Sequence, residues 1–181
     1  MNPTDAFDLV QGIAALERTP RVLHTLLAGA TAQLVERPYG ADTWTAREVI
    51  AHLIYGEQTD WIPRLTHILA HGESEPFGSF DRAGHKALLR LSLEELLESF
   101  ESHRRDSLSA LRARNLGAAE LAKTGRHPAL GVVTVSQLLA TWVVHDLNHI
   151  AQVCKAMAYQ LKADVGPWER YLSVLAPPAP R

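Results

Sequence analysis

The sequence predicts an all-α protein built as a four-helix bundle. Three stretches carry helix start signals directly ahead of a long apolar periodicity, and strand signals are nearly absent. An amphipathic helix buries one apolar stripe, so several long helices are expected to share one core. At 181 residues and 46% hydrophobic side chains, the chain is long enough to form a single domain, predicted over 1–175. The remaining residues, 176–181, are expected to form a flexible C-terminal tail.

The first segment is the least regular. Apolar residues recur from Phe7 to Leu16, and Pro20 then stands ahead of a second apolar run, in a position typical of a first helical turn. Proline cannot donate to the helical hydrogen-bond ladder. We therefore expect a helix that is broken or bent near Thr19 and Pro20 and that ends around Leu34.

Each of the three later helices begins with a capping box, in which Ser or Thr is followed three residues later by Glu or Gln. The pairs are Thr45 with Glu48, Ser92 with Glu95, and Thr134 with Gln137. They predict helices over about 45–70, 92–114 and 134–161. Pro63 lies inside the first of these helices and is expected to bend or divide it.

A long connection, residues 71–91, joins the second and third long helices. It contains glycines, a proline and two phenylalanines, Phe77 and Phe80, that look exposed. Loops of this length in compact domains are often functional covers, so the two rings are candidates to line a pocket. Loop aromatics also serve simply to anchor a loop to the bundle, and both interpretations stay open.

Charge and cysteine content exclude several classes of protein. The 18 basic and 20 acidic residues are interspersed and give a formal charge of −2, so no surface is marked for nucleic acid or an anionic membrane. Cys154 is the single cysteine, which excludes a disulfide framework and cysteine-rich zinc motifs. No apolar run is long enough to span a membrane, and no export signal is recognisable. We expect a cytoplasmic protein with no nucleic-acid or membrane partner.

Two histidines stand in the last apolar run, residues 143–153. His145 and His149 are four residues apart, so they lie about 40° apart on the helical face that also carries Trp142. Desolvating an unpaired polar group costs about 1–3 kcal/mol, so both imidazoles need hydrogen-bond partners or a metal ion. The i, i+4 spacing brings two rings to one point, as in helical zinc motifs. On spacing alone, a metal site and a pair of hydrogen-bonded core histidines remain open.

A third ligand would complete such a site, and His52 is the best candidate. It lies in the middle of the second long helix, and Gly56 leaves space beside it one turn later. Antiparallel packing of this helix against the last one would bring His52 opposite His145. The other six histidines lie in or beside loops, in a polar run or on the first helix.

Polar residues near the histidines carry further hypotheses. Asp146 is expected to bond a neighbouring helix or to orient a metal ligand, and Gln152 is a candidate to bond a metal-bound water; for both, an inter-helix hydrogen bond is the simpler alternative. Asp146 replaces the catalytic glutamate of HExxH zinc proteases and has one methylene less reach, which argues against that activity. Glu57 and Arg64, on one predicted helical face, either brace the bundle or are solvated charges.

The chain resembles the DinB-like superfamily. The resemblance rests on WTAREVIAHLIYGEQTDW together with HPALGVVTVSQLLATWVVHDLNHIAQV, and it covers nearly the whole chain. The HDxxHxxQ signature and the upstream histidine carry it. It implies a four-helix bundle with a metal site in which His52, His145 and His149 bind a divalent ion such as zinc or nickel, with water in the remaining positions. It also implies a homodimer.

A site of this kind predicts a function. Three neutral imidazoles leave a bound ion its positive charge and at least one open position, which is typical of catalytic sites. We therefore expect a metal-dependent enzyme that activates water, as a hydrolase, or the thiol of a low-molecular-weight cofactor, as an S-transferase. A metal-binding or stress-related bundle protein without turnover remains an alternative, as does a purely structural bundle.

Overall fold

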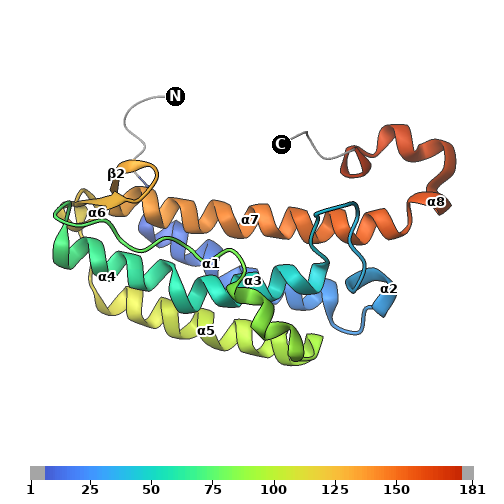
Figure 1. Cartoon of the computed structure of the whole chain (residues 1–181), viewed down its shortest axis with the longest axis horizontal. Coiled ribbons are helices and arrows are strands. Elements are labelled where there is room, and N and C mark those ends of the chain that lie inside the picture. The colour runs from blue at the N-terminus through green and yellow to red at the C-terminus, as the bar shows by residue number, and fades with distance from the viewer. Residues whose placement is uncertain (1–6, 177–181) are drawn as a thin grey trace.

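The computed structural model describes residues 7–176 and consists mainly of helices packed side by side (Figure 1). The long helices are α1 (Leu9–Leu27), α3 (Ala46–Thr59), α4 (Trp61–His71), α5 (Leu93–Ala113) and α7 (Val135–Gln160). Helix α4 continues the direction of α3, so the two count as one long element of the bundle. Together with α1, α5 and α7 they form a four-helix bundle, which confirms the predicted fold class. Short helices fill the connections and the C-terminal end: α2 (Ala32–Val35), η1 (Gly84–Arg90), α6 (Ala118–Leu121), α8 (Lys162–Val165), η2 (Gly166–Tyr171) and η3 (Ser173–Leu175). Apart from Ala176, the predicted tail lies outside the described residues.

The three capping boxes form as the sequence predicts. At the start of α3, the Glu48 backbone N–H donates to Thr45 Oγ1 at 3.0 Å, and the Thr45 backbone N–H donates to Glu48 Oε2 at 2.8 Å. The same exchange starts α5 and α7. The predicted 45–70 helix is divided at Asp60 into α3 and α4. Pro63 lies in the first turn of α4, where a missing N–H leaves no helical bond unmade.

Of the break or bend predicted near Pro20, the break is wrong. Helix α1 runs unbroken through the proline and ends at Leu27 rather than near Leu34. A proline inside a helix leaves the carbonyl oxygen four residues earlier without its N–H partner. Here that oxygen belongs to Leu16, and it accepts a hydrogen bond from Arg104 Nη1 of α5 at 2.9 Å. A side chain from a neighbouring helix therefore replaces the missing bond, and the proline is buried inside the bundle.

A two-stranded antiparallel sheet precedes α7, although the sequence showed almost no strand signal. Strand β1 (Thr124–His127) pairs with β2 (Gly131–Thr134), with Gly125 opposite Val133. The turn is held by His127 Nδ1, which accepts from the backbone N–H groups of the second and third residues after it, at 3.0 and 3.1 Å. Four-residue strands are too short for an alternating pattern to be recognised.

The connection between α4 and α5 packs onto the bundle. The expectation that Phe77 is exposed is wrong, because its side chain is only 4% exposed and its backbone N–H donates to the Arg126 carbonyl of β1 at 3.2 Å. Farther along, η1 packs against α3 and buries His85 to 1% exposure. Among residues 7–176, no helix combines the length and apolar character needed to cross a membrane.

Replacing Gly125 with alanine is expected to destabilise the protein by about 1–3 kcal/mol, because the site has no room for a methyl group. A Cβ at Gly125 would lie 2.5 Å from Cγ1 of Ile68, a core side chain that is 1% exposed. Urea denaturation measures the change. The matched control is Gly78→Ala, because nothing lies within 4 Å of its Cβ position. Equal unfolding free energies for the two variants would contradict this packing of β1 on α4.

Candidate metal centre

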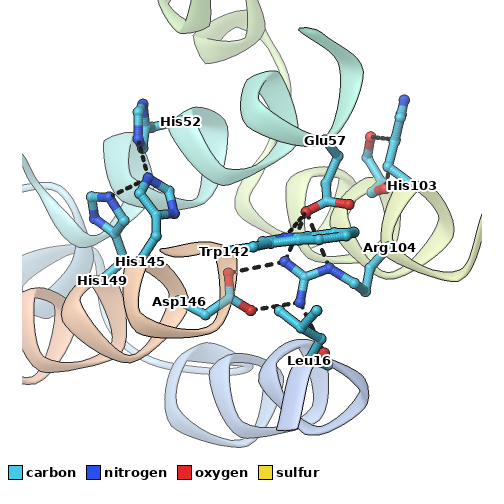
Figure 2. Close-up of polar contacts among 10 residues, drawn as sticks. Leu16, His52, Glu57, His103, Arg104, Trp142, His145, Asp146 and His149 are labelled. Atoms are coloured by element: carbon cyan, nitrogen blue, oxygen red, sulfur yellow. Dashed lines mark hydrogen bonds and ion pairs between the residues drawn. The ribbon is translucent and has the colours of Figure 1, made fainter. Parts of the chain in front are cut away.

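The three predicted ligands face one another across α3 and α7 (Figure 2). The Nε2 atom of His145 lies 3.1 Å from Nε2 of His52 and 3.1 Å from Nε2 of His149. Ligand nitrogens of all three rings lie within 4.8 Å of one another. An ion bound 2.0–2.1 Å from two nitrogens separates them by about 2.9 Å at a right angle and about 3.3 Å at the tetrahedral angle. The two 3.1 Å separations from His145 therefore fit a metal ion shared with His52 and with His149.

Burial keeps the three imidazoles neutral. Loss of hydration, reinforced by neighbouring histidines, lowers the pKa of His52 to about 3 and the pKa of His145 to about 2. Burial also lowers the pKa of His149, although its hydrogen bond to Gln152 and the charge of Asp146 act in the opposite direction. A metal binds the lone pair of a neutral imidazole nitrogen. All three side chains are therefore in the protonation state of ligands at neutral pH.

The outer ring nitrogen of His149 also fits metal ligation. His149 Nδ1 lies 2.8 Å from Gln152 Oε1, and because an amide oxygen only accepts, Nδ1 carries the proton and Nε2 carries the lone pair. The Nδ1 atoms of His52 and His145 are buried and have no hydrogen-bond partner among the described residues. Core histidines retained for stability are expected to be fully hydrogen-bonded. At Nδ1 these two rings are not, so hydrogen bonding alone does not explain their burial.

Gln152 bonds His149 on its own helix rather than a residue of another helix. This contact fixes the orientation of the imidazole and the nitrogen that carries the proton, as hydrogen-bond partners of metal-bound histidines commonly do. That Gln152 also bonds a metal-bound water stays a prediction.

Asp146 lies in a buried charged cluster beside the histidines rather than among them (Figure 2). Arg104 Nη1 donates to Asp146 Oδ2 at 2.5 Å and Nη2 to Oδ1 at 3.0 Å. The same guanidinium donates to Glu57 Oε1 from Nε at 3.1 Å and from Nη2 at 2.8 Å, and Trp142 Nε1 also donates to that oxygen at 3.1 Å. Of the two roles predicted for Asp146, the structure therefore shows the bond to a neighbouring helix.

The predicted face shared by Glu57 and Arg64 does not exist. The helix break at Asp60 separates them, so Glu57 turns into the core toward Arg104, while Arg64 forms an ion pair with Asp60. Asp60 lies between the end of α3 and the start of α4. Because Glu57 and Arg64 belong to different helices, their seven-residue spacing does not place them on one helical face.

Arg104 is the main residue that sequence reasoning missed. It lies in the polar stretch ESHRRD, residues 101–106, but its side chain is 2% exposed. A signal was present, because Arg104 falls on the apolar stripe of α5 at i+7 from Leu97, i+4 from Phe100 and i−4 from Leu108. A charged residue on a core-facing stripe indicates a buried ion pair.

Aromatic rings enclose the histidines. The ring centroid of Trp44 lies 4.8 Å from that of His52, and the centroid of Trp61 lies 5.0 Å from that of His145. Phe80, from the long connection, packs edge-on against His52 at 5.5 Å, which agrees with its predicted place near the site. A cavity of about 480 Å³ reaches His52 and His145, and a second hollow reaches His52 and His149. The cluster is therefore accessible from two sides.

A second group of side chains with metal-ligand chemistry lies on the surface. His67, His71 and Glu75 place ligand atoms within 4.8 Å of one another. His71 Nδ1 is 3.0 Å from Glu75 Oε1, and both side chains are about half exposed. Solvent competes for exposed groups of this kind, so the buried histidine cluster is the stronger candidate.

The pH dependence of the metal-free protein tests the buried histidines. In the unfolded chain their pKa values return to about 6.5, so below that pH the unfolded state binds protons that the folded state cannot. Stability is thus present above pH 6.5 and lost as pH falls, by about 1.4 kcal/mol per pH unit for each of His52 and His145. We expect the free energy of unfolding, measured by urea denaturation, to fall less steeply between pH 6 and pH 5 for His145→Leu than for the wild type. Parallel slopes would contradict the burial of His145.

Comparisons with known proteins agree with this architecture. YfiT from Bacillus subtilis, described as a probable metal-dependent hydrolase with an unusual four-helix bundle topology, superimposes with a TM-score of 0.69 over 87% of this chain and 92% of its own, at 21% identity. A proposed metal-dependent hydrolase of Oceanobacillus iheyensis is 26% identical over 144 residues, 78% of this chain and 81% of that protein. The DinB superfamily profile matches residues 15–153, a span that contains all three histidines. The chain belongs to the DinB superfamily.

Proposed function

We propose that His52, His145 and His149 bind one divalent metal ion, zinc or nickel, and that the protein is a metal-dependent hydrolase of a small molecule. The convergence of three neutral imidazole nitrogens beside a cavity carries this proposal. Two relatives described as metal-dependent hydrolases support the reaction class. When bound, a divalent ion held by three neutral ligands keeps its charge and an open position, and so activates a water or thiol there.

The protein's own residues prepare the site for this chemistry. His52 and His145 line the cavity, so a substrate in it meets the histidine cluster directly. Rings of Trp44, Trp61 and Phe80 limit water around the imidazoles, which strengthens electrostatic interactions in the site.

A thiol S-transferase is the second candidate, with a low-molecular-weight thiol as co-substrate. The hollow that reaches His149 supports it, because it meets the first cavity at His52 and Phe80. A transfer reaction needs places for two reactants beside one reactive centre. Assays of the zinc-loaded protein with ester and amide substrates, with and without added thiols, distinguish the two reactions. Absence of turnover in both would favour a metal-binding bundle protein without catalysis.

Metal addition is expected to stabilise the protein. A ligand at 100 times its dissociation constant adds about 2.7 kcal/mol to the free energy of unfolding when it binds the folded state only. Protein purified without a nickel column and stripped with a chelator should therefore melt several degrees higher with one equivalent of zinc or nickel. Elemental analysis gives the stoichiometry. No bound metal and an unchanged melting temperature would refute the proposed function.

Dimerisation stays a prediction. Val144 and Leu147 are 62% and 57% exposed on α7 and offer an apolar surface for a second copy. Light scattering of the full chain measures the oligomeric state.

A further inference from the structure

The cavity beside His52 and His145 has the size of a small-molecule site. Its volume is about 480 Å³, within the range of ligand pockets in proteins. Helix α4, the connection between α4 and α5, the β-hairpin and α7 all contribute to its wall. Most of that wall is apolar: Trp61, Phe77, Phe80, Leu130, Val133 and Leu138. A ligand that fills it must therefore carry a substantial apolar part.

One polar group in the cavity is fixed but incompletely paired. Arg64 lines the cavity, and its side chain is only 13% exposed. Its Nε is paired with the Asp60 carboxylate, and its guanidinium carbon lies 4.9 Å from the centroid of the Phe77 ring. Within residues 7–176, the Asp60 carboxylate contacts Nε of Arg64, and neither Nη1 nor Nη2 has a hydrogen-bond or ion-pair partner. The protein thus holds the guanidinium in place and leaves its outer N–H donors available.

The charges around the cavity favour an anion. Arg82 also lines it, whereas Asp60 is the one carboxylate among its lining residues in the described part of the chain. Burial, followed by the charge of Arg64, lowers the pKa of His127, so this imidazole adds no charge at neutral pH. Two arginines and one carboxylate leave an excess of positive charge, which attracts anionic ligands into an apolar hollow.

We propose that this cavity binds a small carboxylate with an apolar body, in which Arg64 holds the carboxylate and the apolar walls hold the body. A carboxylate is planar and accepts two parallel N–H bonds, which matches the outer nitrogens of a guanidinium. The far end of such a ligand reaches His52 and His145. The proposal deepens the proposed function and rests on it for the reaction at that end, but carboxylate binding itself depends on Arg64.

The test compares three probes that share one apolar body: 4-phenylbutyrate, 4-phenyl-1-butanol and 4-phenylbutylamine. Each is titrated into the full chain, both chelator-treated and zinc-loaded, and followed by calorimetry. In the chelator-treated protein no metal competes for the carboxylate, so this arm isolates Arg64. We expect the carboxylate to bind most tightly of the three probes. Arg64→Met is expected to lower the affinity for the carboxylate about tenfold or more and to leave the affinity for the alcohol unchanged.

Two further variants sharpen the test. Arg64→Lys keeps the charge but loses the fork of donors, so it is expected to bind the carboxylate more weakly than the wild type. Arg105→Met is the matched control, because this arginine is on the exposed face of α5 and contacts Ser102. Circular dichroism checks that each variant folds, and if Arg64→Met does not, Arg64→Lys decides.

Three outcomes overturn the proposal: equal affinity for the three probes, unchanged carboxylate affinity in the Arg64 variants, or no carboxylate binding at about 10 mM. Metal uptake, measured on the same samples, distinguishes a failure of this proposal from a failure of the proposed function. Arg64-dependent carboxylate binding in a protein that takes up no metal would refute the metal function alone. Full metal uptake without such binding would refute the substrate class alone.

Discussion

Replacing His145 with alanine is expected to abolish tight metal binding at the histidine cluster. Its Nε2 is the atom that lies 3.1 Å from both other Nε2 atoms. Its removal leaves two imidazole ligands in place of three. Loss of a hydrogen-bond partner of a ligand already costs 10–100-fold in affinity, so loss of a ligand should cost more than about 100-fold. Competition with a chromogenic chelator measures the affinity, and elemental analysis after dialysis measures the zinc content.

The surface group provides the matched control for this variant. His71→Ala removes a histidine from the exposed cluster of His67, His71 and Glu75 and should leave the tightly bound equivalent in place. Zinc should also stop raising the melting temperature of His145→Ala but not of His71→Ala. If His145→Ala kept one zinc with wild-type affinity, the three histidines would not be the metal site, and a structural role for them would be the better interpretation.

Replacing Arg104 with methionine is expected to lower the free energy of unfolding by about 3–5 kcal/mol. The substitution leaves the Glu57 and Asp146 carboxylates in the core without their partner, and it also removes the donor to the Leu16 carbonyl that Pro20 leaves free. Burial raises the pKa of Glu57, so the carboxylate is expected to take up a proton more readily once Arg104 is gone. The loss should therefore be smaller at low pH than at pH 8. Urea denaturation at both pH values measures it.

Companion variants show whether the charges cause the loss. Combining Arg104→Met with Glu57→Gln and Asp146→Asn removes both orphaned charges and is expected to recover part of the stability. Arg105→Met changes the adjacent but exposed arginine and should shift stability by less than about 0.5 kcal/mol. A wild-type stability for Arg104→Met would mean that the buried ion pairs contribute nothing to the folded state.

The local features of the sequence predicted much of the fold. Capping boxes at Thr45, Ser92 and Thr134 gave the starts of α3, α5 and α7, because both partners of a capping box lie within one helical turn. The pairing of His145 with His149 was predictable for the same reason, since four residues make about one turn. The division of the second helix followed from the backbone chemistry of Pro63.

The sequence by itself therefore determined the bundle of helices and the histidine pair and pointed to His52 as the third ligand, and the resemblance to relatives strengthened that choice. Only the tertiary structure decided which partners the other polar groups find. Arg104 is buried because Glu57, Asp146 and the Leu16 carbonyl converge on it from three other helices, and Pro20 is accommodated because Arg104 is there. Such contacts join residues tens of positions apart. Their energies depend on how whole helices pack, and no local pattern contains that information.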